Sequence, residues 1–238
     1  MNKSAEGGKE TKQFMCGRYT LAGKMVDLEK QFRAKLEGEA RGQSYNIAPS
    51  QKSPVILNIE PEKLRYETWG LIPFWTKPDE KPRALINTRS DSLLEKPGFR
   101  RYIQHKRCLI PASGFFEWKD EAAGKQPWYI RLKSRENFAF AGIWEEYANQ
   151  DGELIYTYSI ITTGPNKLMS EIHNRMPVIL SGEAEELWLK GNQPSQTGTL
   201  LVPYPDEDVE AWPVSKKVNS PANNDASLIE KIDPGTLF

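Results

Sequence analysis

The sequence is poor in the residues that hold disulfide frameworks and metal centres. It has two cysteines and two histidines in 238 residues, and their positions lack the spacing of a zinc site. Two cysteines cannot staple a chain of this length, and we expect both to be free thiols, as in proteins of a reducing cytosol. The sequence therefore predicts a fold that is held by its hydrophobic core and not by a metal.

Long apolar runs and an excess of either charge are missing as well. No apolar run has the length of a membrane-spanning helix, and residues 1–14 have no apolar centre, which excludes a secretory signal. Lys and Arg number 32, as do Asp and Glu, which argues against a protein that coats duplex DNA by bulk electrostatics. We expect a cytoplasmic protein whose contacts with nucleic acid are local.

Short strands dominate what is present. Hydrophobic residues make up 38% of the chain and aromatic residues 11%, enough for a sizeable core. Runs of β-branched and aromatic residues predict strands at 55–59, 64–69, 84–87, 109–111, 114–118, 128–132, 138–144 and 155–162. Helical patterns fit 25–32, 97–106, 165–172 and 183–189. We predict one α+β domain over residues 16–225, between a disordered extension (1–15) and a C-terminal tail (226–238).

A basic segment is the first candidate for a nucleic-acid contact. It consists of Arg100, Arg101, His105, Lys106 and Arg107. The alternative interpretation is the solvated face of an amphipathic helix with an aromatic inner face. The sequence favours this second interpretation.

Cys16 directly follows an internal methionine, Met15. If the chain is cut after Met15, the cysteine becomes residue one and carries an α-amine beside its thiol. An α-amine titrates near ~7.7–8.0, so a sizeable fraction is nucleophilic at neutral pH. The amine and thiol together can capture an aldehyde as a thiazolidine. The alternative is a small hydrophobic residue at the start of a strand.

Glu117 stands in an aromatic strand and is a candidate general acid or base. Burial there would raise the pKa of its carboxyl into the range useful for proton transfer. Alternation puts Phe115 and Glu117 on one face and Phe116 and Trp118 on the other. Because both faces carry an aromatic residue, the pattern leaves open whether Glu117 faces the core or the solvent.

Three further residues have the chemistry to handle protons and phosphates. His173 lies on an expected loop and can shuttle a proton at neutral pH, although a lone histidine is more often structural; His105, on the basic segment, is a weaker candidate. Asn87 and Arg89 alternate along an expected strand, so both side chains point to one side. The asparagine can orient an amine and the arginine can bind a phosphate, or the two can be a turn residue and a surface arginine.

Tryptophans near glycine and proline form another candidate feature. Trp69, Trp75 and Trp118 can build a stacking platform for unpaired bases. Most tryptophans simply pack in cores. We expect at least Trp69 to lie at a groove for single-stranded DNA.

Eight ordered motifs, spread over most of the chain, resemble those of the SOS-response-associated peptidase (SRAP) family. Together they are much more specific than any one of them. The motifs are Cys16-Gly17-Arg18-Tyr19-Thr20, Tyr45-Asn46-Ile47-Ala48-Pro49, Trp69-Gly70-Leu71-Ile72-Pro73-Phe74-Trp75, Asn87-Thr88-Arg89-Ser90, a pair at Arg107-Cys108-Leu109-Ile110-Pro111-Ala112 and Gly114-Phe115-Phe116-Glu117-Trp118, His173-Asn174-Arg175-Met176-Pro177, and Val218-Asn219-Ser220-Pro221.

The resemblance implies an activity. Members crosslink themselves to abasic sites in single-stranded DNA, so we expect a monomeric, lyase-like enzyme that shields such lesions and associates with the nucleoid when bound to DNA. The implied fold is a single domain with a curved or barrel-like antiparallel sheet core and few peripheral helices. No metal or organic cofactor is implied. The implied catalytic residues are Cys16 as nucleophile, Glu117 as general acid/base, and Asn87 and His173 as proton-handling and positioning groups.

The resemblance also implies a DNA-binding set. Its arginines contact phosphates, and its other members shape the groove, with Thr162 and Thr163 hard to separate in register. Trp118 also belongs to the expected DNA-binding residues, because it is one of the tryptophans that can stack on unpaired bases and not because of the resemblance. The set is Arg18, Arg89, Arg175, Pro49, Trp69 and Thr162.

The residues before Cys16 depart from the family pattern, in which the cysteine follows the initiator methionine. With them in place the crosslink would be blocked. Translation from Met15, an artefactual extension, or a leader that the chain itself removes would each resolve this. Two other functions stay open: a cysteine peptidase in which His173 activates Cys16, and a non-covalent reader of single-stranded or modified DNA.

Overall fold

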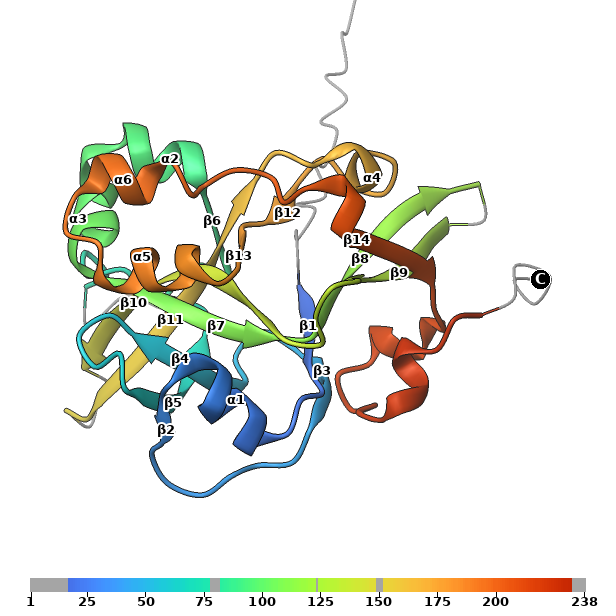
Figure 1. The fold of residues 1–238 in the computed structure, drawn as a ribbon, viewed down its shortest axis with the longest axis horizontal. Coiled ribbons are helices and arrows are strands. Elements are labelled where there is room, and N and C mark those ends of the chain that lie inside the picture. The colour runs from blue at the N-terminus through green and yellow to red at the C-terminus, as the bar shows by residue number, and fades with distance from the viewer. Residues whose placement is uncertain (1–16, 78–81, 123, 149–151, 233–238) are drawn as a thin grey trace, which may run out of the picture.

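The computed structural model describes residues 17–77, 82–122, 124–148 and 152–232 (Figure 1). Cys16 and the expected extension 1–15 lie outside the described residues. The described chain is rich in strands, as expected. Six α-helices lie around them in the part of the chain that is described.

Five strands close into a barrel. Their order around it is β11-β10-β7-β4-β5, with antiparallel neighbours. A parallel pairing between β5 and β11, at Thr68 with Thr157, closes the circle. The predicted barrel-like core is therefore confirmed, although its closing pair is parallel and not antiparallel. The barrel strands are β4 (Lys52–Leu57), β5 (Lys63–Trp69), β7 (Arg107–Ala112), β10 (Phe138–Ala148) and β11 (Leu154–Thr163).

A second, antiparallel sheet packs beside the barrel. Its order is β14-β9-β8-β1-β3. Tyr19 of β1 joins the two sheets, because its ring lies edge-on to Trp69 at 5.1 Å and its hydroxyl lies 2.7 Å from that of Tyr158 in β11. The strands are β1 (Arg18–Leu21), β3 (Ser44–Ile47), β8 (Gly114–Glu121), β9 (Gly124–Leu132) and β14 (Val209–Pro213).

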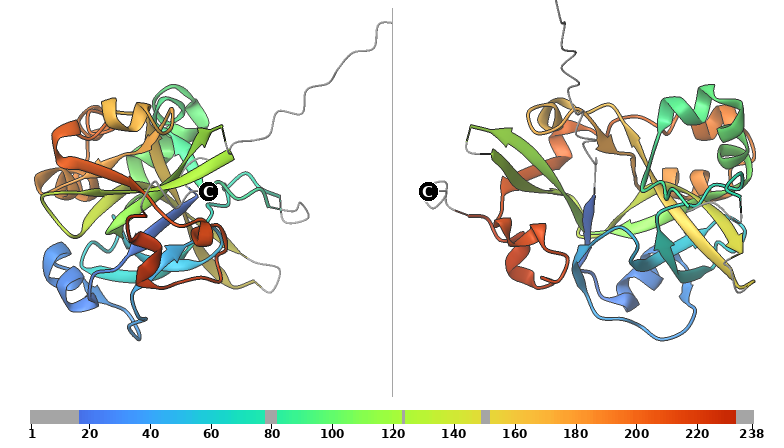
Figure 2. Two further views of the ribbon diagram at one scale, coloured as in Figure 1. Left: turned by 90° about the vertical axis from the view of Figure 1, so that its right-hand side faces the viewer. Right: turned by 180° about the vertical axis from the view of Figure 1, so that it is seen from behind.

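The helices gather mainly on one side of the barrel. Figure 1 and the view from behind in Figure 2 show α2, α3 and α6 together on one side and the β8–β9 ribbon on the other. The sequence predicted α1, α3, α4 and α5 but neither α2 nor α6. The helices are α1 (Met25–Phe32), α2 (Ser90–Glu95), α3 (Pro97–His105), α4 (Lys167–Ser170), α5 (Glu183–Lys190) and α6 (Pro194–Gly198).

The basic segment is an amphipathic helix, as the sequence favoured, with one exception. Tyr102 and Ile103 are buried, whereas Arg100 and His105 are exposed. Arg107 is the exception, because it is 3% exposed. Its guanidinium donates hydrogen bonds to carbonyls at the C-terminal ends of α3 and α5, among them those of residues 103, 104 and 188. A cation at these helix ends is stabilising, and Arg107 is therefore not part of a nucleic-acid surface.

The C-terminal segment is packed and not a free tail, at least to residue 232. Two 3-10 helices, η2 (Lys216–Asn219) and η3 (Ala226–Ile229), follow β14. Leu228 is fully buried in a cluster with Phe116 and Val218. The tail expected from residue 226 is corrected accordingly. Among the described residues, no helix is long and apolar enough to cross a membrane.

Candidate functional site

Strand β1 begins beside Glu117. Arg18 pairs with Phe116 and Tyr19 with Phe115, so the residue after Phe116 lies at the end where the chain enters β1. Gly17 is the first residue that the structure describes. Cys16, the expected nucleophile, precedes Gly17 directly and lies outside the described residues. The strand register therefore brings the chain into β1 next to the Glu117 carboxyl.

Glu117 is buried, which resolves the question that the sequence left open. Its side chain is 1% exposed. Phe115 belongs to the main core, while Phe116 and Trp118 belong to the smaller C-terminal cluster. Alternation along β8 places Glu117 on the face of Phe115. A carboxyl group that is shielded from solvent beside the start of β1 is a candidate for proton transfer in a reaction at that end of the strand.

A loop from the C-terminal segment holds Arg18 and Trp118. Trp118 Nε1 donates to Asn219 Oδ1 at 2.8 Å, and the Arg18 guanidinium donates to the Asn219 carbonyl at 3.3 Å. Burial lowers the pKa of Arg18. Asn219 therefore fixes one arginine and one tryptophan at the start of β1.

Asn46 on β3 in turn fixes this loop. Its Nδ2 donates to the carbonyls of Val218, Ser220 and Asn223 at 3.2, 2.9 and 2.9 Å, and the residue is 2% exposed. Asn46 and Asn219 could not be identified as positioning residues from the sequence. Both lie within the family motifs, but only the fold shows that the two motifs are in contact.

Short strands on both edges of β11 gather the remaining candidates. β6 (Asn87–Arg89) runs parallel to β11 where β5 has ended, and β12 (Met176–Pro177) runs antiparallel on the other edge. Thr162 pairs with Arg89 on one edge and with Pro177 on the other. The end of β11 therefore brings three distant segments together.

The side chain of Thr162 contacts Arg175 and is shielded from solvent. It is fully buried, and its hydroxyl accepts hydrogen bonds from Arg175 Nε at 3.2 Å and Nη2 at 3.1 Å. Its carbonyl accepts another from Nη2 at 2.5 Å. The neighbouring Thr163 instead donates to the Leu201 carbonyl at 3.2 Å. The two threonines are thus distinguished, and Thr162 orients the guanidinium.

Arg89 and Arg175 place two positive charges near one carboxylate. Arg89 forms a forked contact with Asp91, with donor–acceptor distances of 2.5 to 3.1 Å. This hydrogen bonding lowers the pKa of Asp91 to about 2, and the charge of Arg175 contributes in the same direction. The charge of Glu95 also acts on Arg89, so two guanidiniums, the groups that bind phosphates in a fork, lie here among nearby carboxylates.

Asn87 and Arg89 point to the same side of β6, as expected. Thr88 between them is buried, and its hydroxyl lies 2.9 Å from that of Ser159. Alternation turns its two neighbours the other way. Trp69 ties this strand to β1, because its Nε1 donates to the Ile86 carbonyl at 2.8 Å while its ring lies against Tyr19.

His173 lies at the end of α4 and is 7% exposed. Its backbone N–H donates to the Met169 carbonyl at 2.7 Å, and the Arg175 N–H donates to its Nδ1 at 3.2 Å. The Arg175 carbonyl also lies 3.3 Å from Nδ1. The N–H contact requires Nδ1 to accept and the carbonyl contact requires it to donate, so the two contacts fix the position of the ring and leave both tautomers open.

The expected stacking role of Trp69 is wrong. The residue is 1% exposed, with Tyr19 packed against its ring and its Nε1 bonded to the Ile86 carbonyl, so no ring face is open to a base. The sequence could not show this, because a buried and an exposed tryptophan have the same spacing. Pro49, in the turn after β3, and Trp118 are both partly exposed.

Trp75 is exposed and belongs to an aromatic surface that also includes Phe74 and Phe99. Phe74 and Trp75 are 48% and 47% exposed, and their ring centroids lie 5.0 Å apart. Trp75 also contacts Phe99, at 5.5 Å. Arg101 stacks over the Phe74 ring at 4.1 Å. Exposed rings beside a guanidinium suit unpaired bases. Of the three tryptophans expected as a platform, Trp75 has the exposure that stacking requires.

The described residues offer neither a metal site nor a second reactive thiol. No group of three or more His, Cys, Asp or Glu among them can hold a metal ion. Cys108 is fully buried in β7, and burial raises the pKa of its thiol well above the ordinary value. Since the thiolate is the nucleophile, Cys108 is inert.

Comparisons with known proteins agree with this arrangement. The family model described as SOS response associated peptidase (SRAP) matches residues 15–221. Abasic site processing protein YoqW of Bacillus subtilis (strain 168) is 46% identical over 223 residues, which cover 91% of this chain and 99% of that protein. Abasic site processing protein HMCES of Xenopus tropicalis is 33% identical over 76% of this chain and 64% of its own length. A crystal structure of a protein from Bacteroides thetaiotaomicron superposes with a TM-score of 0.83 at 31% identity, over 91% of this chain and 100% of that one.

Proposed function

This chain belongs to the SOS response associated peptidase (SRAP) family, and we propose that it processes abasic sites in single-stranded DNA by crosslinking itself to them through Cys16. Relatives that are 46% and 33% identical to it over the aligned residues are named abasic site processing proteins. An abasic site carries a sugar aldehyde in its ring-opened form. An N-terminal cysteine is suited to capture such an aldehyde.

The reaction balances as a condensation that loses one water. The α-amine of Cys16 attacks the aldehyde carbon and gives a carbinolamine, which loses water to form an imine. The thiol sulfur then adds to the imine carbon, and its proton goes to the nitrogen. The product is a five-membered thiazolidine that joins the protein to the deoxyribose.

The buried Glu117 carboxyl suits the proton transfers of this reaction. Carbinolamine dehydration needs an acid at the leaving hydroxyl, and ring closure needs a base at the thiol. We assign the first role to Glu117 and assign His173 to the exchange of protons with solvent through its imidazole. Asn87, on β6, orients the amine or a sugar hydroxyl.

The exposed and half-buried arginines hold the DNA backbone. Arg18, Arg89 and Arg175 bind phosphates on either side of the missing base, with Arg175 oriented by Thr162. Pro49 and Trp118 border the groove. The exposed rings of the aromatic surface stack on bases of the flanking strand. Stacking of this kind favours a single strand, because its bases are accessible.

One observation carries the proposal most directly. The pairing of Arg18 with Phe116 brings the chain into β1 beside a carboxyl that is 1% exposed. The crosslink needs Cys16 at that end of β1 and needs its nitrogen to be a free amine. The family match, which begins at Met15, supports the proposal that Cys16 is the residue exposed when a methionine is removed.

The test compares chains that start at Met1 and at Cys16. Each is incubated with a single-stranded oligonucleotide that has one abasic site, and products are separated under denaturing conditions. The Cys16-start chain should give a stable protein–DNA band, and the Met1-start chain should give none. Cys16→Ser in the shorter chain should leave at most a reversible imine, while Cys108→Ser should crosslink as the parent does.

The same experiment distinguishes the other two functions. A cysteine peptidase would release a fragment ending at Met15 or cleave an added peptide, without a DNA band. A non-covalent reader would retain the oligonucleotide under native conditions and lose it on denaturation. Either result in place of the stable band contradicts the proposal.

A further inference from the structure

We propose that Glu145 is a positioning residue for DNA binding: it fixes Arg101, and through Arg101 the aromatic surface of Phe74, Trp75 and Phe99. The inference rests on the proposed function in that single-stranded DNA is the ligand of this surface. Glu145 lies on β10 of the barrel, outside the set of residues assigned to the reaction.

The aromatic surface has a composition that suits a nucleic-acid strand. Its rings are edge-packed, with Phe74 and Trp75 about half exposed. Arg100 is exposed on the same helix as Phe99 and Arg101. Base faces stack on rings and phosphates pair with guanidiniums, so this surface offers both contacts that an unpaired strand requires.

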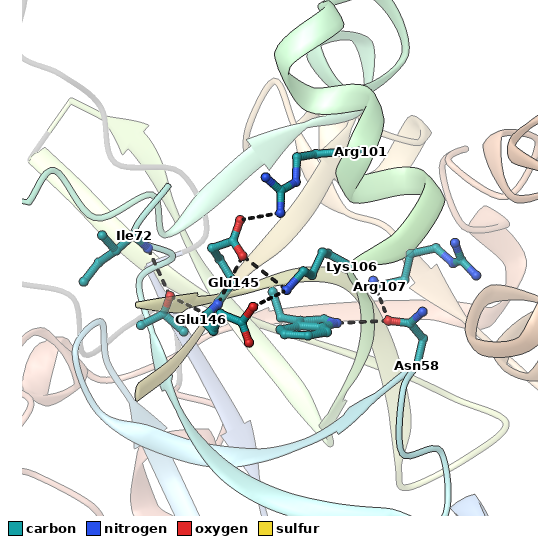
Figure 3. A network of polar contacts seen from close by, with 9 residues as sticks. Asn58, Ile72, Arg101, Lys106, Arg107, Glu145 and Glu146 are labelled. Atoms are coloured by element: carbon teal, nitrogen blue, oxygen red, sulfur yellow. Dashed lines mark hydrogen bonds and ion pairs between the residues drawn. The ribbon is translucent and has the colours of Figure 1, made fainter. Parts of the chain in front are cut away.

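Glu145 is a buried carboxylate with two cationic partners. It is 1% exposed. Its Oε2 lies 3.7 Å from an Arg101 guanidinium nitrogen, and its Oε1 lies 3.3 Å from Lys106 Nζ. Figure 3 shows both basic side chains pointing toward it. A buried charge persists where partners compensate for its lost hydration, so the geometry of Arg101 and Lys106 is tied to that of Glu145.

Arg101 links the buried Glu145 carboxylate to the exposed Phe74 ring. Its guanidinium stacks over Phe74 at 4.1 Å while it faces Glu145. The ring of Tyr102, which is fully buried, supports Phe74 and Trp75 from below at 6.3 and 6.5 Å. Burial and the Glu145 charge raise the pKa of the Tyr102 hydroxyl. Without the carboxylate, Arg101 loses the charge that holds its guanidinium over Phe74.

The loop with Phe74 and Trp75 has a separate backbone anchor. It leaves β5 at Gly70, whose φ of 130° suits glycine. The Ile72 N–H then donates to Thr157 Oγ1 at 3.0 Å, and that hydroxyl donates to the Glu145 carbonyl at 3.3 Å. This chain of bonds uses the backbone of Glu145, so it survives replacement of the side chain. A side-chain variant therefore leaves this backbone anchor in place and tests what the carboxylate does for the side chains of the surface, and Arg101→Gln tests the link through Arg101 separately.

Glu146 provides a matched control. It follows Glu145 directly and its carboxylate lies 3.2 Å from the same Lys106 Nζ. Its side chain is 48% exposed, and its only described cationic partner is Lys106. Glu145→Gln and Glu146→Gln remove the same charge from neighbouring positions, but only the first releases Arg101.

The experiment measures affinity and crosslinking separately in the Cys16-start chain. Affinity is measured by anisotropy with a labelled single strand that has no abasic site, and crosslinking is followed at saturating abasic DNA. We expect Glu145→Gln to weaken affinity about tenfold, the equivalent of one lost stacked base, with the crosslinking rate within twofold of the parent. Glu146→Gln should change neither. Equal affinities for the two variants would overturn the proposal, as would a Glu145→Gln loss confined to the crosslinking rate.

Arg101→Gln keeps the proposal testable if Glu145→Gln folds poorly. It removes the exposed end of the link and leaves the buried carboxylate with Lys106. We expect the same tenfold loss, and in the double variant no further loss, because the two residues act in one chain. Unchanged affinity in Arg101→Gln, or additive losses, would overturn the proposal. If the unsubstituted Cys16-start chain crosslinks but does not bind intact single strands, the role proposed for Glu145 is contradicted and the proposed function is not. If that chain does neither, the proposed function is contradicted as well.

Discussion

The carboxyl of Glu117 differs from the other acidic side chains of β8 in its depth. Glu121, on the same strand, is exposed, whereas Glu117 is 1% exposed and lies where the chain enters β1. We expect Glu117→Gln to slow crosslinking by about 10²-fold or more, the usual contribution of general acid–base catalysis. Affinity for an intact single strand should stay within twofold.

The measurement is a time course of the denaturation-resistant band at saturating abasic DNA. Glu121→Gln is the control and should react as the parent does. A Glu117→Gln chain that crosslinks at the parental rate would show that the proton transfers do not depend on this carboxyl.

Glu185 on α5 predicts a dependence of stability on pH. Its Oε1 is buried and has no hydrogen-bond partner among the described residues. Burial raises the pKa of this carboxyl to about 7, although the charge of Arg135 acts in the other direction. The folded protein therefore holds a proton that the unfolded chain releases above 4.5. The free energy of unfolding should fall as pH rises from 4.5 to 7 and then level off.

Glu185→Gln should remove this fall. Urea denaturation should show the variant more stable than the parent at pH 8, by up to about 3 kcal/mol, and nearly equal at pH 4. Glu186→Gln is the matched control, because the Lys190 hydrogen bond lowers the pKa of Glu186 and its carboxylate is exposed. If Glu185→Gln tracks the parent at every pH, the carboxyl is ionised normally in the folded state.

Single residues also mark where sequence reasoning stops. Composition and spacing identified Glu117 and Trp69 as notable, but both faces of β8 carry aromatic residues and a tryptophan pattern does not reveal depth. Only the fold shows that both side chains are buried. It places Glu117 on the core face of β8 and packs the Tyr19 ring against that of Trp69. Thr162 and Thr163 were indistinguishable in sequence for the same reason, and their hydrogen bonds now separate them.

The loop around η2 is the element that holds Arg18 and Trp118. Its backbone depends on one buried amide, Asn46, which donates to three of its carbonyls. We expect Asn46→Ala to lower the free energy of unfolding by about 2 kcal/mol, at about 1 kcal/mol for each of the two N–H bonds of the amide that the three carbonyls share. It should also weaken binding of single-stranded DNA, because Asn219 no longer holds the arginine and the indole.

Urea denaturation and the anisotropy assay measure the two effects of Asn46→Ala. Asn223→Ala, which removes one bond from the exposed side of the same loop to the Lys217 carbonyl, should change both by much less. Equal effects of the two substitutions would contradict the role given to Asn46.

Among the secondary-structure elements, the long strands were predicted well from the sequence and the short elements poorly. Strands such as β10 and β11 have many β-branched and aromatic residues, so local preference and burial agree. β6 and β12 are too short to have a pattern of their own, and their pairing with β11 defines them. The sequence could therefore name Asn87 and Arg175 through the family resemblance but could not show that one strand end brings them together.

The whole molecule is a barrel with a second sheet joined to it through β1. The closing pair between β5 and β11 is parallel, and such long-range pairing cannot be read from a local pattern. Local patterns nevertheless predicted a strand-rich α+β domain correctly, and the barrel core that the family resemblance implied is found as well. The packed segment up to residue 232 was not expected, because prolines and asparagines hide the buried Leu228.

The zero net charge predicts weak dependence of DNA binding on salt. The proposed phosphate contacts are Arg18, Arg89 and Arg175, with Arg100 and Arg101 near the aromatic surface. At about 0.7 per contact for a single strand, the slope of log affinity against log salt should be roughly −2 to −4. Anisotropy titrations across a salt series measure this slope. A much steeper dependence would show bulk electrostatic binding, which the charge balance excludes.

The mass of the crosslinked peptide tests the central claim most directly. The Cys16-start chain is reacted with abasic single-stranded DNA, the product is digested with protease and nuclease, and the modified peptide is sequenced by mass spectrometry. The account predicts that the sugar remnant is on Cys16, with a mass equal to the sum of the two partners less one water. The same remnant on a lysine, or its absence from the cysteine peptide, would contradict it.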